Sequence, residues 1–156
     1  MINAIYPGTF DPVNLINLET ISFCLDIFDN FLIAIIHNGE SRFTEIERVS
    51  MLEDSIEGEG LDYKREIKVC CDFPRLIEEE DISVIIEDVY VSKSINRLIN
   101  DSLYNQINSS EVRTFFIGPT FDYLQVNEEL IDRLLDEKKI DSLRKFVPKS
   151  VINYLN

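Results

Sequence analysis

A short loop near the N-terminus holds the first residue types that could contact a ligand. Residues 6–13 read tyrosine, proline, glycine, threonine, phenylalanine, aspartate, proline and valine, directly after an apolar run. Thr9 offers a hydroxyl group, and the carboxylate of Asp11 could contact a ligand or hold a divalent metal ion. Gly8, Asp11 and Pro12 are equally typical of a tight turn, so Thr9 and Asp11 could instead only shape the loop.

Other polar candidates follow later apolar runs of the chain. The candidate residues for binding a nucleotide or another substrate are Gly8, Thr9, Phe10, Asp11, Arg42, Tyr90 and Asn127. Arg42 could form an anion patch with Lys93 and Arg97, although solvated side chains are the more ordinary interpretation. His37, at the end of the second apolar run, is interpreted as a loop residue rather than a catalyst.

Cysteine and histidine usage argues against a metal centre. The chain has three cysteines, Cys24, Cys70 and Cys71, and one histidine, with no Cys/His cluster. Cys70 and Cys71 are neighbours on a predicted strand, so their side chains should point to opposite faces. We therefore expect no metal site and no complete set of disulfides. The cysteines are predicted to be small buried side chains in a reducing compartment.

The elements that must position these residues follow from hydrophobic periodicity. Short apolar runs predict strands over residues 3–6, 31–36, 66–71, 83–86 and 114–117. Amphipathic stretches predict helices over residues 18–28, 44–56, 73–80, 94–107 and from 127 onwards. Thr44 and Glu47 have the spacing of a capping box, and Pro148 suits the first turn of a last helix.

Five strands with intervening helices predict an α/β fold. We expect a single Rossmann-like, doubly wound domain over residues 1–156 with a five-stranded parallel sheet. Ligands of such folds bind outside the carboxyl ends of the strands, at the switch point of the sheet. A site is therefore expected in the loops 7–15, 87–93 and 118–129.

Composition limits the classes of partner. The 156 residues are 45% hydrophobic and 28% charged, which is an ordinary globular mixture. The 15 basic residues stand against 29 acidic ones, and the net charge of −14 predicts no nucleic-acid partner. The longest unbroken apolar run, residues 31–36, is too short to span a bilayer, and no signal peptide is recognised. We therefore expect a cytoplasmic protein with no membrane partner.

The loop at residues 6–13 resembles the opening of phosphopantetheine adenylyltransferase, which has the same run from the tyrosine to the second proline. The likeness continues in residues 43–49 and 114–117, in Pro119, Thr120, Asp122 and Tyr123, and in Val147, Pro148 and Val151. The resemblance implies the nucleotidyltransferase form of the Rossmann fold (nucleotidyltransferase / adenine nucleotide alpha-hydrolase-like). It also implies a reaction of coenzyme A biosynthesis, in which the phosphate of 4′-phosphopantetheine attacks the α-phosphorus of ATP and pyrophosphate leaves.

The catalytic motif implied by this resemblance is altered. After the first strand, the family has threonine or histidine, any residue, glycine and histidine, of which the histidine donates to the α-phosphate. The matching residues are Asn14, Leu15, Ile16 and Asn17. Asparagine can donate a hydrogen bond but carries no charge, and a β-branched residue replaces a glycine that lets the backbone approach the nucleotide. We therefore assign no catalytic residue and treat Asn14 and Asn17 as degenerate positions.

The phosphate-binding segments of the family are altered as well. Glu87, Asp88, Val89 and Tyr90 replace arginine-glycine-leucine-arginine after the fourth strand. Val126, Asn127, Glu128 and Glu129 replace a serine-rich turn, and Asp132 replaces the basic residue that follows it. A lysine that the family places after the second strand has no clear equivalent among residues 38–42. Each unpaired acid beside a polyphosphate should cost about 1–4 kcal/mol.

Two functions from different classes follow. The leading hypothesis is a catalytically impaired or inactive relative, a pseudoenzyme that serves as a binding or scaffold module without a cofactor. The alternative is an active nucleotidyltransferase that passes a nucleotidyl group from an NTP to a phosphorylated acceptor such as 4′-phosphopantetheine. Its rebuilt site would use Mg²⁺, held by Asp11 or Glu87. The expected partners are a small nucleotide or pantetheine ligand, a second copy in a homo-oligomer, or an unknown protein, including a neighbouring domain of a longer chain.

Overall fold

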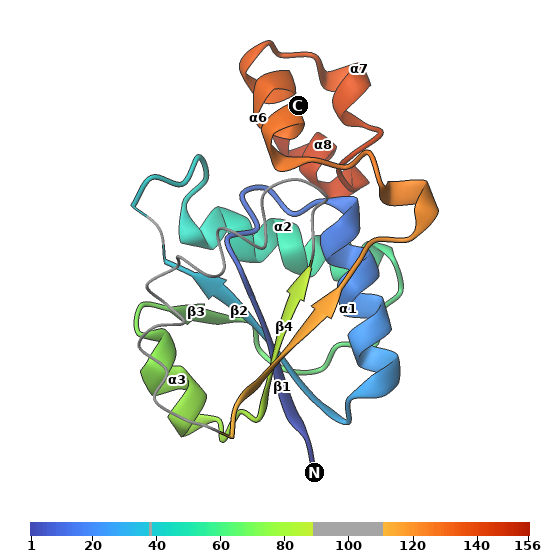
Figure 1. Ribbon diagram of the computed structural model, residues 1–156. Helices are drawn as coiled ribbons and strands as arrows, with labels where there is room; N and C mark the ends of the chain where they lie inside the picture. The colour runs from blue at the N-terminus through green and yellow to red at the C-terminus, as the bar shows by residue number, and fades with distance from the viewer. Residues whose placement is uncertain (38, 89–110) are drawn as a thin grey trace.

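The computed structural model describes residues 1–37, 39–88 and 111–156. Within them, five parallel strands form one sheet in the order β3-β2-β1-β4-β5 (Figure 1). The strands are β1 (Asn3–Gly8), β2 (Asn30–Ile36), β3 (Lys68–Cys70), β4 (Val84–Asp88) and β5 (Arg113–Ile117). The direction of strand order reverses between β1 and β4, which places a switch point at the carboxyl ends of these two strands. The predicted parallel, doubly wound α/β fold is confirmed.

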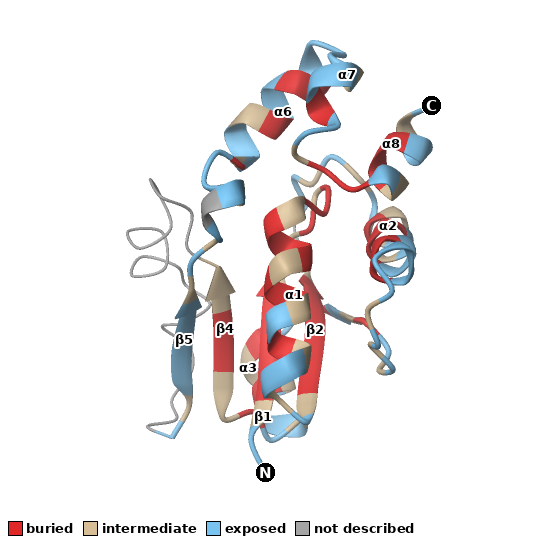
Figure 2. Cartoon of the chain, turned by 90° about the vertical axis from the view of Figure 1, so that its right-hand side faces the viewer, coloured by how far each residue is buried: buried red, intermediate tan, exposed pale blue. Residues whose placement is uncertain are grey.

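Helices cover both faces of the sheet. α1 (Leu15–Ile27) and α2 (Glu45–Gly58) lie on one face, and α3 (Phe73–Glu79) lies on the other (Figures 1 and 2). After β5, the 3₁₀ turn η1 (Phe121–Tyr123) leads to α6 (Glu128–Asp136), α7 (Ile140–Leu143) and α8 (Lys149–Leu155), beyond the carboxyl ends of the strands. The helix predicted over residues 94–107 lies outside the described residues.

The central strands are buried on both faces because nearly every position in them is apolar. Tyr6 and Ile33 point toward α1 and α2 and belong to the larger core cluster. Ile5 and Leu32 point the other way and join a smaller cluster beneath α3. This continuous burial is the usual pattern of a parallel sheet that has helices on both faces.

The predicted elements are found where the described residues test them, with shifted ends, and the stretch predicted to be helical from residue 127 onwards divides into α6, α7 and α8. Thr44 and Glu47 form the expected capping box at the start of α2, and Pro148 lies immediately before α8. β1 runs two residues further than predicted, to Gly8, because its last residues pair with β2. β3 is limited to residues 68–70, because only these pair with β2.

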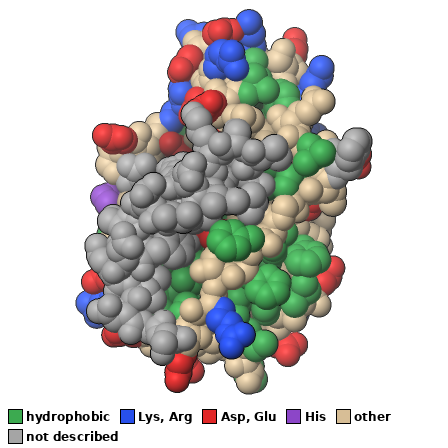
Figure 3. Space-filling view, viewed as in Figure 1, with side chains coloured by type: hydrophobic (Ala, Val, Ile, Leu, Met, Phe, Trp, Pro, Cys, Tyr) green, Lys and Arg blue, Asp and Glu red, His purple; other side chains and the backbone are tan. Residues whose placement is uncertain are grey.

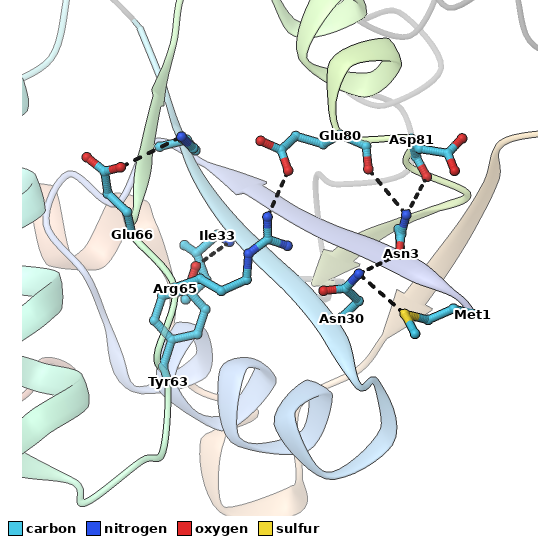
Figure 4. Close-up of polar contacts among 10 residues, drawn as sticks. Met1, Asn3, Asn30, Ile33, Tyr63, Arg65, Glu66, Glu80 and Asp81 are labelled. Carbon is cyan, nitrogen blue, oxygen red and sulfur yellow. Dashed lines mark hydrogen bonds and ion pairs between the residues drawn. The ribbon is translucent and has the colours of Figure 1, made fainter.

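The amino ends of the strands are tied together by side-chain contacts (Figure 4). The Asn3 amide donates to the carbonyls of Glu80 at 3.3 Å and Asp81 at 3.0 Å, just before β4. The Asn30 amide, at the start of β2, donates to Asn3 Oδ1 at 2.8 Å. Arg65 Nη2 pairs with Glu80 Oε2 at 2.7 Å. These contacts fix the end of the sheet opposite the switch point.

Several sequence expectations concern exposure. Cys24 and Cys70 are buried as predicted, but Cys71 is exposed because it lies just beyond the end of β3, so the prediction of burial is wrong for it. His37 is an exposed residue directly after β2, as expected. Among the described residues, no helix is long and apolar enough to cross a membrane.

Gly8, at the end of β1, allows a close approach of the Phe10 ring. A Cβ atom at Gly8 would lie 2.9 Å from Phe10 Cε2. The ring cannot move aside freely, because Phe10 is 3% exposed and packs edge-on against Tyr6, with ring centroids 5.3 Å apart. We predict that Gly8→Ala lowers the free energy of unfolding by about 1–3 kcal/mol in urea denaturation. The control is Gly118→Ala, whose Cβ would meet nothing within 4 Å. Equal losses in the two variants would contradict the role assigned to Gly8.

Candidate functional site

Three side chains from three elements meet at the switch point. Tyr6 from β1 donates its hydroxyl hydrogen to Asp88 Oδ2 at the end of β4. Asn17 from the first turn of α1 donates through Nδ2 to Tyr6 Oη at 2.9 Å and to Asp88 Oδ2 at 3.1 Å. We call these three residues the switch-point triad. It lies where the altered catalytic motif and the altered arginine motif of the sequence come together.

Every polar atom of the Asn17 side chain already has a partner inside the protein. Nδ2 serves the triad, and Oδ1 accepts from the backbone N–H of Asn14 at 2.9 Å. Asn14 Oδ1 accepts in return from the backbone N–H of Asn17 at 3.0 Å, which completes a capping box at the start of α1. Asn14 and Asn17 are 2% and 7% exposed. The two degenerate positions therefore hold the helix, and a phosphate could use the Asn17 amide only by breaking the triad.

Asp88 is an acid in an unfavourable place for a charge. Burial raises the pKa of its carboxyl group, and the hydrogen bonds from Tyr6 and Asn17 only partly oppose this shift. Burial, followed by the negative charge of Asp88, raises the pKa of the nearby Cys24 thiol to about 12, so Cys24 is no nucleophile at neutral pH. The environment of the triad thus resists negative charge.

The loop after β1 is built largely by internal contacts. The Asp11 carboxylate accepts from the backbone N–H of Arg42 at 2.7 Å and of Phe43 at 2.8 Å. The Thr9 carbonyl accepts from Arg48 Nη1 at 2.7 Å. Asp11 therefore ties this loop to the loop between β2 and α2. These contacts favour the turn-shaping role of Asp11 over a ligand-binding one.

The Arg42 side chain contacts α6. Its Nη2 lies 2.8 Å from Asp136 Oδ1 and 3.8 Å from Asp132 Oδ1. Partial burial raises the pKa of Asp132 and the negative charges of Asp11 and Asp136 add to the shift, whereas the Arg42 charge opposes it. Arg42 is thus an exposed residue, as the solvated interpretation expects, and forms a surface ion pair with α6.

The start of α6 is capped by its own chain. Asn127 Oδ1 accepts from the backbone N–H of Glu129 at 2.8 Å and of Leu130 at 3.3 Å. The resemblance would place phosphates at this helix start. The Asn127 side chain, however, already accepts hydrogen bonds from two of the backbone N–H groups there. Tyr90, Lys93 and Arg97 lie outside the described residues.

One residue that matters for this region, Arg48, was not a sequence candidate. It is 1% exposed, and its Nη1 also donates to the Ile36 carbonyl at 3.2 Å. Together with His37, Ser41 and Arg42 it lines a cavity of about 400 Å³ at the end of β2. Arg48 follows Thr44 by four residues and therefore lies one turn inside α2. Helical periodicity alone does not indicate that such a charged side chain is buried.

No metal centre is formed by the part of the chain that the structure describes. No group of three or more His, Cys, Asp or Glu side chains there could hold a metal ion. Asp11 is one of the two acids considered for Mg²⁺. Each of its two carboxylate oxygens accepts a hydrogen bond from a backbone N–H group.

A parallel sheet with helices on both faces, a helix that begins at the switch point, and a site at the strand ends define a doubly wound, Rossmann-like α/β protein. The family model described as cytidylyltransferase-like matches residues 5–148, and the chain belongs to this family. Within that superfamily it is a phosphopantetheine adenylyltransferase-like member, as the following relatives indicate.

The similar curated proteins cover nearly the full length of the chain. Phosphopantetheine adenylyltransferase of Borreliella burgdorferi (strain ZS7) is 25% identical over 157 residues, covering 97% of this chain and 94% of that protein. The enzyme of Wolbachia pipientis wMel is 27% identical over 153 residues, covering 97% and 89%. The crystal structure of the lipopolysaccharide core biosynthesis protein from Thermoplasma volcanium GSS1 matches with a TM-score of 0.52 and 15% identity. It covers 77% of this chain and 97% of that one, and supports the fold alone.

The raised pKa of Asp88 gives a test of the triad. A carboxyl group with a raised pKa in the folded state contributes stability below its ordinary pKa of 3.8 that is lost as the pH rises through the folded value. Asparagine at this position keeps an acceptor oxygen for Tyr6 and Asn17 but never ionises. We predict that Asp88→Asn raises the Tm at pH 7 and that the gain shrinks toward pH 3. Thermal unfolding between these pH values measures it.

The control for this experiment is Asp26→Asn, which removes an exposed acid near the C-terminal end of α1. It reports the effect of net charge alone. A gain in Tm for Asp88→Asn that is independent of pH, or one that Asp26→Asn reproduces, would contradict a buried, charge-averse Asp88.

Proposed function

We propose that this protein is a catalytically silent relative of the phosphopantetheine adenylyltransferases whose fold serves as a binding or scaffold module. The observation that carries the proposal is the switch-point triad. The amide of Asn17, which stands where the family histidine would contact the α-phosphate, donates instead to Tyr6 and Asp88. The protein's own carboxyl group thus accepts a hydrogen bond from the residue that would otherwise face the phosphate.

Energetics support the same conclusion. Loss of one donor to a transition state typically costs about 3–4 kcal/mol. An acid that faces a polyphosphate adds about 1–4 kcal/mol of repulsion, and Asp88 stands where the family has a glycine between two phosphate-binding arginines. Both effects act on the same step, so their sum corresponds to a loss of several orders of magnitude in rate.

The alternative is an active nucleotidyltransferase with a rebuilt site. It is favoured by the likeness of residues 6–13 to the opening of that family, by the full-length similarity to phosphopantetheine adenylyltransferases, and by the cavity beside Arg48. Such an enzyme would transfer a nucleotidyl group from an NTP to a phosphorylated acceptor such as 4′-phosphopantetheine, with Mg²⁺ supplying the charge that the loops lack.

An exposed apolar surface supports a protein-binding role. Phe23 and Ile27 lie one turn apart on α1 and are 46% and 51% exposed. Phe115, 54% exposed, pairs with Ile86 in register and so lies on the same face of the sheet as α1. Figure 3 shows hydrophobic side chains gathered in this part of the molecule. Apolar groups collected on a surface commonly mark an interaction site, for a second copy or for another protein.

The deciding experiment is calorimetric titration of the purified protein with ATP and Mg²⁺, 4′-phosphopantetheine and coenzyme A, followed by an assay of pyrophosphate release. We expect no ATP binding at physiological concentrations and no pyrophosphate. Measurable adenylyl transfer to any acceptor would refute the proposal and establish the active alternative.

A variant that carries the family residues serves as the positive control for the expected absence of ATP binding. Asn17→His combined with Asp88→Gly puts the family residues back at two positions and removes the carboxyl group. We expect ATP affinity to rise at least about tenfold, because about 1.4 kcal/mol of repulsion is relieved. Asp26→Asn, which changes the net charge far from the switch point, should leave the affinity unchanged.

A further inference from the structure

The outer edge of β5 is an open strand edge. β5 is the last strand of the sheet, and among the described residues only β4 pairs with it. The Arg113 N–H donates to the Ser83 carbonyl at 2.9 Å, just before β4. The N–H and C=O groups of successive strand residues point to opposite edges, so Phe115 also faces β4, whereas Thr114 and Phe116 face outwards. The N–H and C=O groups of these two residues bond to no described part of the chain.

Hydrophobic side chains flank this edge on both faces of the sheet. Phe115 lies on the face of α1 and Phe116 on the face of α3, and each is 54% exposed. β5 crosses in front of the other strands in Figure 1, and the same view in Figure 3 shows hydrophobic side chains gathered along this part of the molecule. Natural edge strands are usually protected by proline, lysine or other charged side chains. β5 has no proline, and Arg113, its first residue, is its only charged residue.

The strand can pair with itself in a register that satisfies the outward groups of both residues. When two copies of β5 run antiparallel about a two-fold axis at Phe115, Thr114 of each copy lies opposite Phe116 of the other. Residues paired in this way exchange both of their N–H···O=C bonds. The two Phe115 side chains then meet at the axis as a close aromatic pair, which stabilises the contact. Arg113 lies opposite Ile117, so no like charges face each other across the strands.

We propose that the protein forms a symmetric dimer in which two β5 strands pair antiparallel about Phe115 and join the two sheets into one. A two-fold contact uses the same surface on both copies and closes after one pairing, which covers an edge that would otherwise invite aggregation. Phe23 and Ile27 of α1, 46% and 51% exposed, lie on the same face of the sheet as Phe115 and extend the apolar surface.

The size and charge of the contact limit its affinity. The half-exposed rings of Phe115 and Phe116 in two copies can bury about 400 Å². Together with the paired strands, this area lies near or below the lower end of stable interfaces, about 1,200 Å². The net charge of −14 on each copy also opposes association. The dimer is therefore weak and forms reversibly.

This dimer names the partner of the exposed apolar surface and rests on the proposed binding or scaffold function. It requires nothing of the switch-point triad, because the triad residues Tyr6, Asn17 and Asp88 bond to one another within one copy. The self-complementary register of β5 favours a second copy over a strand from a different protein.

Sedimentation equilibrium of the full chain measures the assembly, and amide hydrogen exchange locates it. We expect a reversible monomer–dimer equilibrium with a Kd in the micromolar range. The Thr114 and Phe116 amides should exchange slowly only at concentrations at which the dimer forms. The Arg113 amide, which donates to the Ser83 carbonyl within one copy, should be protected at every concentration.

Charged substitutions at the axis test the register. Phe115→Lys and Phe115→Glu each remove the aromatic pair and place like charges opposite each other, so each should weaken the dimer at least about tenfold. An equal mixture of the two variants should restore a dimer, because a lysine of one copy then faces a glutamate of the other. Ile46→Lys, at an 83% exposed residue of α2, is the control for added charge and should leave the Kd nearly unchanged. Circular dichroism spectra verify that each variant is folded.

A chain that remains monomeric at millimolar concentration would overturn the proposal. So would an assembly that Phe115→Lys leaves intact, or a mixture of the two charged variants that stays monomeric. Protection of the Thr114 and Phe116 amides only after a different protein is added would also overturn it, since the edge would then bind a strand of that protein. None of these variants alters the triad. ATP binding or adenylyl transfer therefore decides the silent-enzyme proposal separately, whether or not the dimer forms.

Discussion

The hydrogen bonds that converge on Asp88 Oδ2 are the constraint on which the region at the strand ends depends. They join β1, β4 and the first turn of α1 through one oxygen atom, with Tyr6 and Asn17 as donors. Since Asn17 is also half of the capping box, the start of α1 and the end of β4 cannot shift independently. A carboxyl group with a raised pKa is held there by two neutral donors, and none of the ion pairs among the described residues involves it.

The same principle recurs at each neighbouring position. The Asp11 carboxylate accepts hydrogen bonds from two backbone N–H groups. Asn127 caps the helix that follows it, and Arg42 forms an ion pair with an acid of α6. Each of these groups could serve an anionic ligand or its metal if it were free. Each is turned instead to a partner within the chain. Arg48 differs from all of them, because within the described part of the chain its guanidinium donates to backbone carbonyls and to no carboxylate.

Much of the fold could be predicted from the sequence because local residue patterns determine where its strands and helices lie. Apolar runs located all five strands, and the Thr44–Glu47 spacing located the start of α2. The extents of β1 and β3 could not be read in this way, because they are decided by pairing with β2 rather than by composition. Cys71 was misjudged for a related reason, since it lies one residue past the last paired position.

The sequence identified which residues of the site depart from the family, but not which of them form hydrogen bonds with one another. The substitutions at Asn17 and Asp88 were visible as departures from a family motif, yet nothing in the sequence indicated that they would bond to each other across 71 positions. The single substitutions look like losses: a histidine becomes an amide, and a glycine becomes an acid. Together they are a compensated pair, because the acid accepts the hydrogen bond that the amide donates.

That compensation explains how the fold can persist without a ligand. A site built of converging cations and free helix N–H groups is destabilised by self-repulsion and unsatisfied donors until a phosphate arrives, which is one source of the trade-off between stability and activity. Here neutral donors and internal acceptors replace those groups, so the polar groups of the switch point satisfy one another. Only the buried carboxyl group of Asp88 still carries a penalty, and protonation or a neutral replacement relieves it. Under the proposed scaffold function, selection for stability rather than for turnover would account for the residues at the strand ends.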